Sequence, residues 1–118
     1  MIMEIDFITS NKGKIAALKR SFLNAGRFDI KVNQVQADIV EPQLNNIADV
    51  SKYKAMEAFK ILKKPILVED GGLVIEALNG FPGPYTKYVL STIGIDGILK
   101  LMNGENNRAA KFVSFATF

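Results

Sequence analysis

The sequence contains no cysteine, no histidine and no tryptophan. Without cysteine the chain forms no disulfide and offers no thiol nucleophile. Without histidine it has neither a Cys/His zinc site nor a Ser-His-Asp triad. A bound metal ion would therefore be a hard cation held by oxygen atoms, which favours Mg²⁺ or Mn²⁺. A general base would be an aspartate, a glutamate, a lysine or a tyrosine.

Long apolar runs and concentrated charge are also missing. No stretch approaches the ~18 apolar residues of a membrane span, so we expect no membrane partner. The 15 basic and 12 acidic residues give a net charge of +3, which suits an anionic ligand such as a nucleotide. The lysines are dispersed along the chain, so we expect no nucleic-acid partner. The lack of cysteine agrees with a cytoplasmic location.

The 118 residues alternate between strand-like and helix-like patterns, and their number is that of one domain. Apolar periodicity, glycines and prolines predict strands over residues 3–9, 29–36, 66–70, 73–78 and 108–118. They predict helices over residues 15–25, 46–63 and 85–103, the last of them broken near Gly94. The order strand, helix, strand, helix, strand indicates an α/β layer fold.

Two segments predict how the core is built. In the helix over residues 46–63 the expected buried stripe consists of Ala55, Ala58, Phe59 and Leu62. Residues 66–68 are wholly apolar, as in a strand covered on both faces. Two glycines, at positions 71 and 72, are expected to break this strand before the alternation resumes at Leu73.

A polar segment, residues 9–14, joins the first strand to the first helix. Ser10 or Asn11 can cap the helix. Lys12 and Lys14 lie near its first turn, where the positive end of the helix dipole disfavours them unless an anion binds there. A phosphate at this helix start is one interpretation, and a capped helix with solvated lysines is the other.

Carboxylates follow the buried strand. In α/β sheets ligands bind beyond the carboxyl ends of the strands, where Glu69 and Asp70 lie. Neighbouring side chains point to opposite sides, so only one of the two is expected to face a site and to bind Mg²⁺ or activate water. A polar strand end is the alternative. Glu41 reads as a solvated loop residue unless Asp70 needs a second metal ligand, and Lys54 reads as a surface lysine of the second helix.

A stiff loop follows at residues 80–85, where two glycines and two prolines specify a fixed backbone shape. Such a loop either shapes a site or forms a structural corner.

Taken in order, these segments resemble the inosine triphosphate pyrophosphatase family, also called the Ham1 family. The resemblance rests on residues 9–14, 41–43, 68–73 and 76–85 and on Arg108. It implies a layered mixed sheet flanked by helices around a cleft, with residues 1–118 as a single α/β domain that lacks the family's C-terminal part. It also implies an enzyme that hydrolyses non-standard purine nucleoside triphosphates (ITP, dITP, XTP) to the monophosphate and pyrophosphate and so cleanses the nucleotide pool.

The resemblance also implies roles for residues. Asp70 would be the general base, and Glu41 and Asp70 would hold Mg²⁺, with Mn²⁺ as a possible substitute. Substrate would contact Thr9, Ser10, Asn11, Lys12, Gly13, Lys14, Lys54 and Gly71. A homodimer is expected. The family's base-reading motif contains a histidine that this chain lacks, so the alternative is an inactive remnant that binds nucleotide or acts through a partner.

Overall fold

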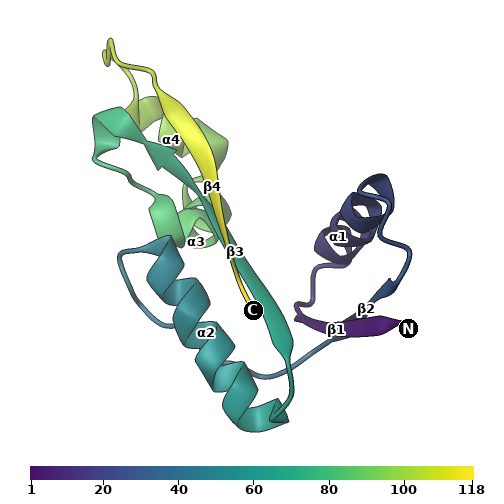
Figure 1. The fold of residues 1–118 in the computed structure, drawn as a ribbon. Coiled ribbons are helices and arrows are strands. Elements are labelled where there is room, and N and C mark those ends of the chain that lie inside the picture. Colours follow the sequence, from purple (N-terminus) through teal and green to yellow (C-terminus); the bar gives the residue numbers. More distant parts are fainter. The chain divides into compact units, whose positions relative to one another are not determined.

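The computed structural model describes all 118 residues as an alternation of strands and helices (Figure 1). The elements are β1 (Met3–Ile8), α1 (Lys12–Asn24), β2 (Ile30–Val35), α2 (Ile47–Leu62), β3 (Ile66–Ile75), η1 (Glu76–Leu78), η2 (Gly83–Tyr85), α3 (Thr86–Thr92), α4 (Gly94–Leu101) and β4 (Ala110–Thr117). The short η elements are 3₁₀ turns. No helix combines the length and the hydrophobicity needed to span a bilayer.

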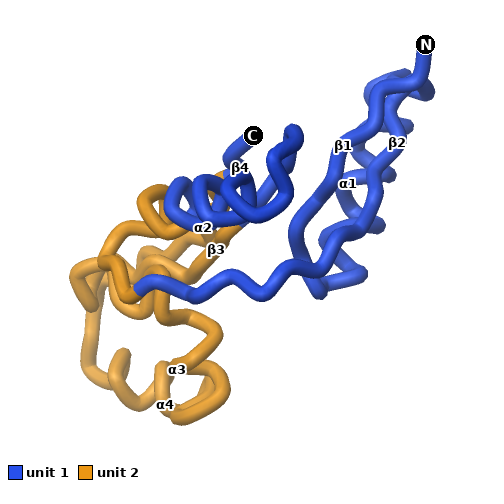
Figure 2. Tube along the Cα trace, turned by 90° about the horizontal axis from the view of Figure 1, so that it is seen from below, with its two compact units in different colours: residues 1–42, 51–69, 116–118 blue, residues 43–50, 70–115 orange.

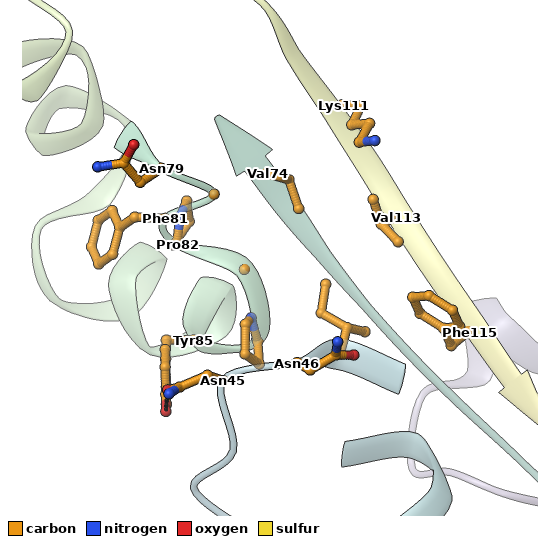
Figure 3. Close-up of a pocket in the computed structure, with 14 residues that line it drawn as sticks. Asn45, Asn46, Val74, Asn79, Phe81, Pro82, Tyr85, Lys111, Val113 and Phe115 are labelled. Atoms are coloured by element: carbon orange, nitrogen blue, oxygen red, sulfur yellow. Dashed lines mark hydrogen bonds between the residues drawn. The ribbon is translucent and has the colours of Figure 1, made fainter. Parts of the chain in front are cut away.

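The four strands form one sheet in the order β2-β1-β3-β4. β1 runs parallel to both of its neighbours, with Phe7 opposite Gln34 on β2 and opposite Leu67 on β3. Figure 3 shows β4 running in the direction opposite to β3. The sheet is therefore mixed and flanked by helices, which confirms the predicted fold class.

The chain divides into two compact units (Figure 2). Unit 1 consists of residues 1–42, 51–69 and 116–118, and unit 2 of residues 43–50 and 70–115. Each unit has hydrophobic clusters of its own.

In unit 1, apolar side chains cover both faces of the strands. Phe7 and Leu67 belong to a cluster with α1, whereas Ile66 and Val68 pack with Ala58 of α2. Successive strand residues point to opposite faces, so adjacent positions on β3 reach different helices. The interpretation of residues 66–68 as a strand covered on both faces is confirmed.

The predicted stripe on α2 is wrong at one position. Ala55 and Ala58 are buried, but the side chain of Phe59 is 55% exposed. Each residue along a helix turns by about 100°, so a stripe that runs through Ala55, Ala58 and Leu62 leaves Phe59 beside it. Ser51 and Ala58 are fully buried, and these small side chains let the helix approach its neighbours closely.

The expectation that two glycines break the third strand is also wrong, because β3 continues through Gly71 and Gly72 to Ile75. A Cβ atom at Gly72 would overlap the carbonyl oxygen of Gly83. A glycine inside a strand often marks such a close backbone approach. Gly72 therefore allows the backbone of β3 to pack closely against Gly83 within unit 2, and it does not end the strand.

The core of unit 2 lies between β3 and the helices that follow it. Ile75, Val89, Ile98 and Met102 are buried together, with Leu73 packed against them. The predicted helical break near Gly94 is confirmed, since α3 ends at Thr92 and Gly94 has a φ of +67°. Only glycine adopts that backbone conformation without a steric cost.

Candidate functional site

Residues 9–14 form a hydrogen-bonded turn at the start of α1, inside unit 1. Asn11 is the cap, because its Oδ1 accepts from the backbone N–H groups of Gly13 (2.9 Å) and Lys14 (3.3 Å). Thr9 Oγ1 accepts in turn from the N–H of Asn11 at 3.0 Å. The cap occupies two N–H groups that a phosphate at a helix start would otherwise use. An anion here would therefore depend on side-chain donors, namely the Asn11 amide and the lysines.

Lys14 reaches a carboxylate of β3. Its Nζ lies 2.6 Å from Glu69 Oε2, and both residues belong to unit 1. The sequence left open which member of the Glu69-Asp70 pair faces a site, and the family resemblance selected Asp70. Glu69 was therefore a candidate that was not selected, although its position directly after the apolar run of residues 66–68 had pointed to it.

Lys54 and Glu41 were predicted for different roles, one for phosphate and the other for metal. The structure brings them together within unit 1, where Lys54 Nζ lies 3.4 Å from Glu41 Oε2. Lys54 projects from α2 and is mostly buried, whereas Glu41 lies in the segment between β2 and α2 and is mostly exposed. Lys14 and Lys54, two of the three lysines predicted to contact substrate, thus each contact a carboxylate.

Asp70 and Gly71 belong to unit 2, where both lie on β3. Oδ2 of Asp70 is buried. Carboxylate oxygens are the ligands that Mg²⁺ prefers, so the donor type fits the expected ion. The structure contains no group of three or more acidic side chains placed to share a metal ion. Glu41 and Asp70 lie in different units, and their pairing on one ion stays a prediction.

A further charged cluster in unit 1 lies on β1. The carboxylate of Asp6 is 2.6 Å from Lys64 Nζ and accepts a hydrogen bond of 3.1 Å from Asn33 Nδ2. These hydrogen bonds lower the pKa of Asp6 below its usual value. The bond from Lys64 has the larger effect, and the bond from Asn33 the next largest. Asn33 stands opposite Asp6 in the sheet register, so the cluster ties β1 to β2 and to the turn before β3.

Unit 2 contains a cavity of about 500 Å³ beside the stiff loop (Figure 3). Its lining combines amides, aromatic rings and one lysine: Asn45, Asn46, Asn79, Phe81, Tyr85, Phe115 and Lys111. Tyr85 Oη donates to Asn45 Oδ1 at 3.2 Å. The stiff loop therefore lines a cavity. One of the two interpretations of its glycines and prolines was that the loop shapes a site. No sequence motif connects these distant segments, so the asparagines and Lys111 were not predicted.

Comparison with known proteins gives consistent matches. Curated relatives include the dITP/XTP pyrophosphatase of Methanopyrus kandleri, 46% identical over 112 residues, which covers 95% of this chain and 58% of the relative. The dITP/XTP pyrophosphatase of Saccharolobus solfataricus is 37% identical over 116 residues, with coverages of 98% and 59%. The chain thus spans less than two thirds of the length of these relatives.

Solved structures share the fold. The HAM1 protein from Coxiella burnetii matches with a TM-score of 0.80 at 23% identity, over 98% of this chain and 62% of that one. The nucleoside-triphosphatase (dITP/XTP pyrophosphatase) from Mycobacterium abscessus gives a TM-score of 0.76 at 23% identity, over 97% and 63%. The family model described as "Ham1 family" matches residues 5–118. Because that match spans nearly the whole chain, this protein belongs to the Ham1 family.

Proposed function

We propose that this chain is the phosphate- and metal-binding part of a hydrolase acting on non-standard purine nucleoside triphosphates such as ITP, dITP and XTP. The products are the nucleoside monophosphate and pyrophosphate, and the role is to cleanse the nucleotide pool. The observation that supports this most is the 46% identity over 112 residues to a protein named dITP/XTP pyrophosphatase. The proposal includes a single domain over residues 1–118, a homodimer and a cytoplasmic location.

Glu41 and Asp70 are the residues that would hold the divalent cation, Mg²⁺ or Mn²⁺. When bound, such an ion neutralises charge on the triphosphate and acidifies a coordinated water. Two carboxylates are few ligands for a cation of this kind. This is compatible with Mg²⁺, which usually binds through one or two carboxylates together with waters and substrate phosphates.

Asp70 acts as the general base. It takes a proton from the attacking water while the new bond forms between the water oxygen and the α-phosphorus. The bond from that phosphorus to the bridging oxygen breaks, and pyrophosphate leaves with the electron pair. The burial of Oδ2 supports this role, because a base shielded from bulk water keeps its proton exchange within the site.

Lys14 and Lys54 hold the triphosphate as point charges, and the Asn11 amide donates to a phosphate oxygen. The other residues of the turn, Thr9, Ser10, Lys12 and Gly13, border the same ligand, and Gly71 offers its backbone N–H. Lys14 and Lys54 each contact a carboxylate. Triphosphate binding therefore exchanges the carboxylate partner of each lysine for phosphate oxygens.

The test is to incubate the purified chain with dITP and Mg²⁺ and to measure pyrophosphate. We expect release of pyrophosphate, and not of orthophosphate, that stops when a chelator removes the cation. The alternative is an inactive chain that binds nucleotide. Heat released on dITP binding in calorimetry, without any pyrophosphate, would support that alternative.

A further inference from the structure

The side chain of Thr86 joins two separate segments of unit 2. Thr86 is the first residue of α3 and is only 9% exposed. Its Oγ1 accepts a hydrogen bond of 2.8 Å from the N–H of Leu73 on β3. The same hydroxyl donates a hydrogen bond of 2.6 Å to the carbonyl of Gly83 in η2. One buried hydroxyl therefore satisfies a polar group of the strand and another of the loop.

The same segments also touch through their backbones. Gly72 leaves no room for a Cβ atom, because that atom would overlap the carbonyl oxygen of Gly83. Gly83 has a φ of +54°, a conformation that favours glycine. Gly83 O thus contacts the strand backbone at Gly72 and accepts from Thr86, so the loop fixes the strand at two consecutive residues.

The attachment continues along β3 beyond Leu73. Val74 forms an isolated antiparallel bridge with Pro82, and Figure 3 shows both residues at the cavity. The N–H of Ile75 donates to Phe81 O at 3.3 Å. In the half of β3 that follows Asp70 and Gly71, Leu73 is thus bonded to Thr86, and Val74 and Ile75 pair with the stiff loop.

We propose that Thr86 is a positioning residue for Asp70. By accepting from the Leu73 N–H and donating to the Gly83 carbonyl, it fixes the backbone of residues 70–73 and with it the direction of the Asp70 carboxylate. This inference rests on the proposed function, in which Asp70 is the general base. The hydroxyl is essential because a single group must accept from an N–H and donate to a carbonyl. Serine can do both and valine can do neither.

The experiment compares three substitutions. Thr86→Val keeps the shape of the side chain and removes both hydrogen bonds, and Thr86→Ser keeps them. Thr92→Val is the matched control, because Thr92 Oγ1 donates only to the carbonyls of Tyr88 and Val89 within α3. The readouts are kcat and KM for pyrophosphate release from dITP, together with calorimetric titration of Mg²⁺ alone.

We expect Thr86→Val to lower kcat by about 10- to 100-fold, because small displacements of a reacting group have large effects on rate. KM is expected to stay within about threefold, since the phosphate-binding lysines belong to unit 1. Thr86→Ser and Thr92→Val should retain the wild-type kcat. A normal kcat in Thr86→Val, or an equal loss in Thr86→Ser, would overturn the proposal. If Thr86→Val does not fold, Thr86→Ala removes the same hydroxyl and is judged by the same criteria.

The Mg²⁺ titration separates this proposal from the proposed function. If the wild-type chain releases no pyrophosphate, the proposed activity fails, yet Asp70 can still be probed through the cation. Thr86→Val is then expected to weaken Mg²⁺ binding by about fivefold, while Thr92→Val binds it as the wild type does. Equal Mg²⁺ affinities in wild type and Thr86→Val would overturn the positioning role whatever the activity.

Discussion

At the scale of single residues, the main feature is that lysines and carboxylates of the candidate site neutralise one another. Lys14 contacts Glu69, and Lys54 contacts Glu41. Ion pairs at partly exposed positions are weak, so a triphosphate with several charged oxygens can replace the carboxylates. Glu69 and Glu41 are thus the carboxylate partners of the two lysines that we propose bind the triphosphate.

The assignment of Asp70 is tested by Asp70→Asn. The amide keeps the shape of the side chain but cannot accept the proton of the attacking water, so pyrophosphate release should fall by at least about 100-fold. Thermal unfolding should show that the variant stays folded. Turnover at the wild-type rate in Asp70→Asn would mean that another residue is the base.

The role of Glu69 is tested by Glu69→Gln. Removing its charge releases Lys14, so pyrophosphate should bind about three- to tenfold more tightly in the absence of metal. Isothermal titration calorimetry measures this affinity. Glu57→Gln is the control, because Glu57 pairs with Lys60 on the surface of α2 at 2.9 Å. Weaker binding in Glu69→Gln than in Glu57→Gln would contradict this explanation.

At the scale of elements, β3 shows what local sequence predicts and what it does not. The apolar run Ile66–Val68 predicted a strand covered on both faces because alternation and burial are encoded locally. Gly72 was misread as a strand breaker, because its reason is a contact with Gly83, eleven positions away along the chain. The sequence offered both Ser10 and Asn11 as the cap of α1. Only the hydrogen bonds in the structure show that Asn11 is the cap.

The packing explanation of Gly72 predicts the effect of Gly72→Ala. The added methyl group overlaps a backbone carbonyl that no side-chain rotation can move, so the free energy of unfolding should fall by about 2–3 kcal/mol. Urea denaturation measures the change. Gly26→Ala offers a comparison, because Gly26 has a φ of +73° with no atom near its Cβ position, and should cost about 1 kcal/mol. Equal stability of Gly72→Ala and wild type would refute the close contact.

The cluster that ties β1 to β2 predicts a dependence of stability on pH. Hydrogen bonds from Lys64 and Asn33 lower the pKa of Asp6 in the folded state. A carboxylate whose pKa is depressed by folding stabilises the protein above its unfolded pKa of about 3.9 and loses that effect as pH falls below it. Asp6→Asn should therefore lose less stability between pH 6 and pH 3 than wild type does. Urea denaturation at both pH values checks this, with the exposed Asp38→Asn as control.

At the scale of the whole molecule, the residues proposed for the site are divided between the two units. Lys14, Lys54, Glu41 and Glu69 belong to unit 1, and Asp70 and Gly71 to unit 2. The fold class followed from the order of predicted elements and was confirmed. The pairing of Glu41 with Asp70 was implied by family resemblance alone, because no local pattern links a loop glutamate to an aspartate 29 positions later in the chain.

The outer strand of the sheet supports the proposed homodimer. β4 is the last strand in the sheet order, and Phe112 on it is 81% exposed. Edge strands with exposed apolar side chains tend to acquire a partner. We expect sedimentation equilibrium to give a mass of twice 13.0 kDa, and Phe112→Lys to shift the protein toward the single-chain mass. A wild-type protein that sediments as a single chain would count against the dimer.

The path of the chain limits how this fold can be recombined. The backbone passes between units 1 and 2 after residues 42, 50, 69 and 115, so neither unit is one continuous stretch. One of these passages separates Glu69 from Asp70. A chimera that exchanged a single unit between two Ham1 relatives would need a junction at each passage, one of them between these two acidic residues. Gene fusion at one crossover point would instead combine segments of both units from each parent.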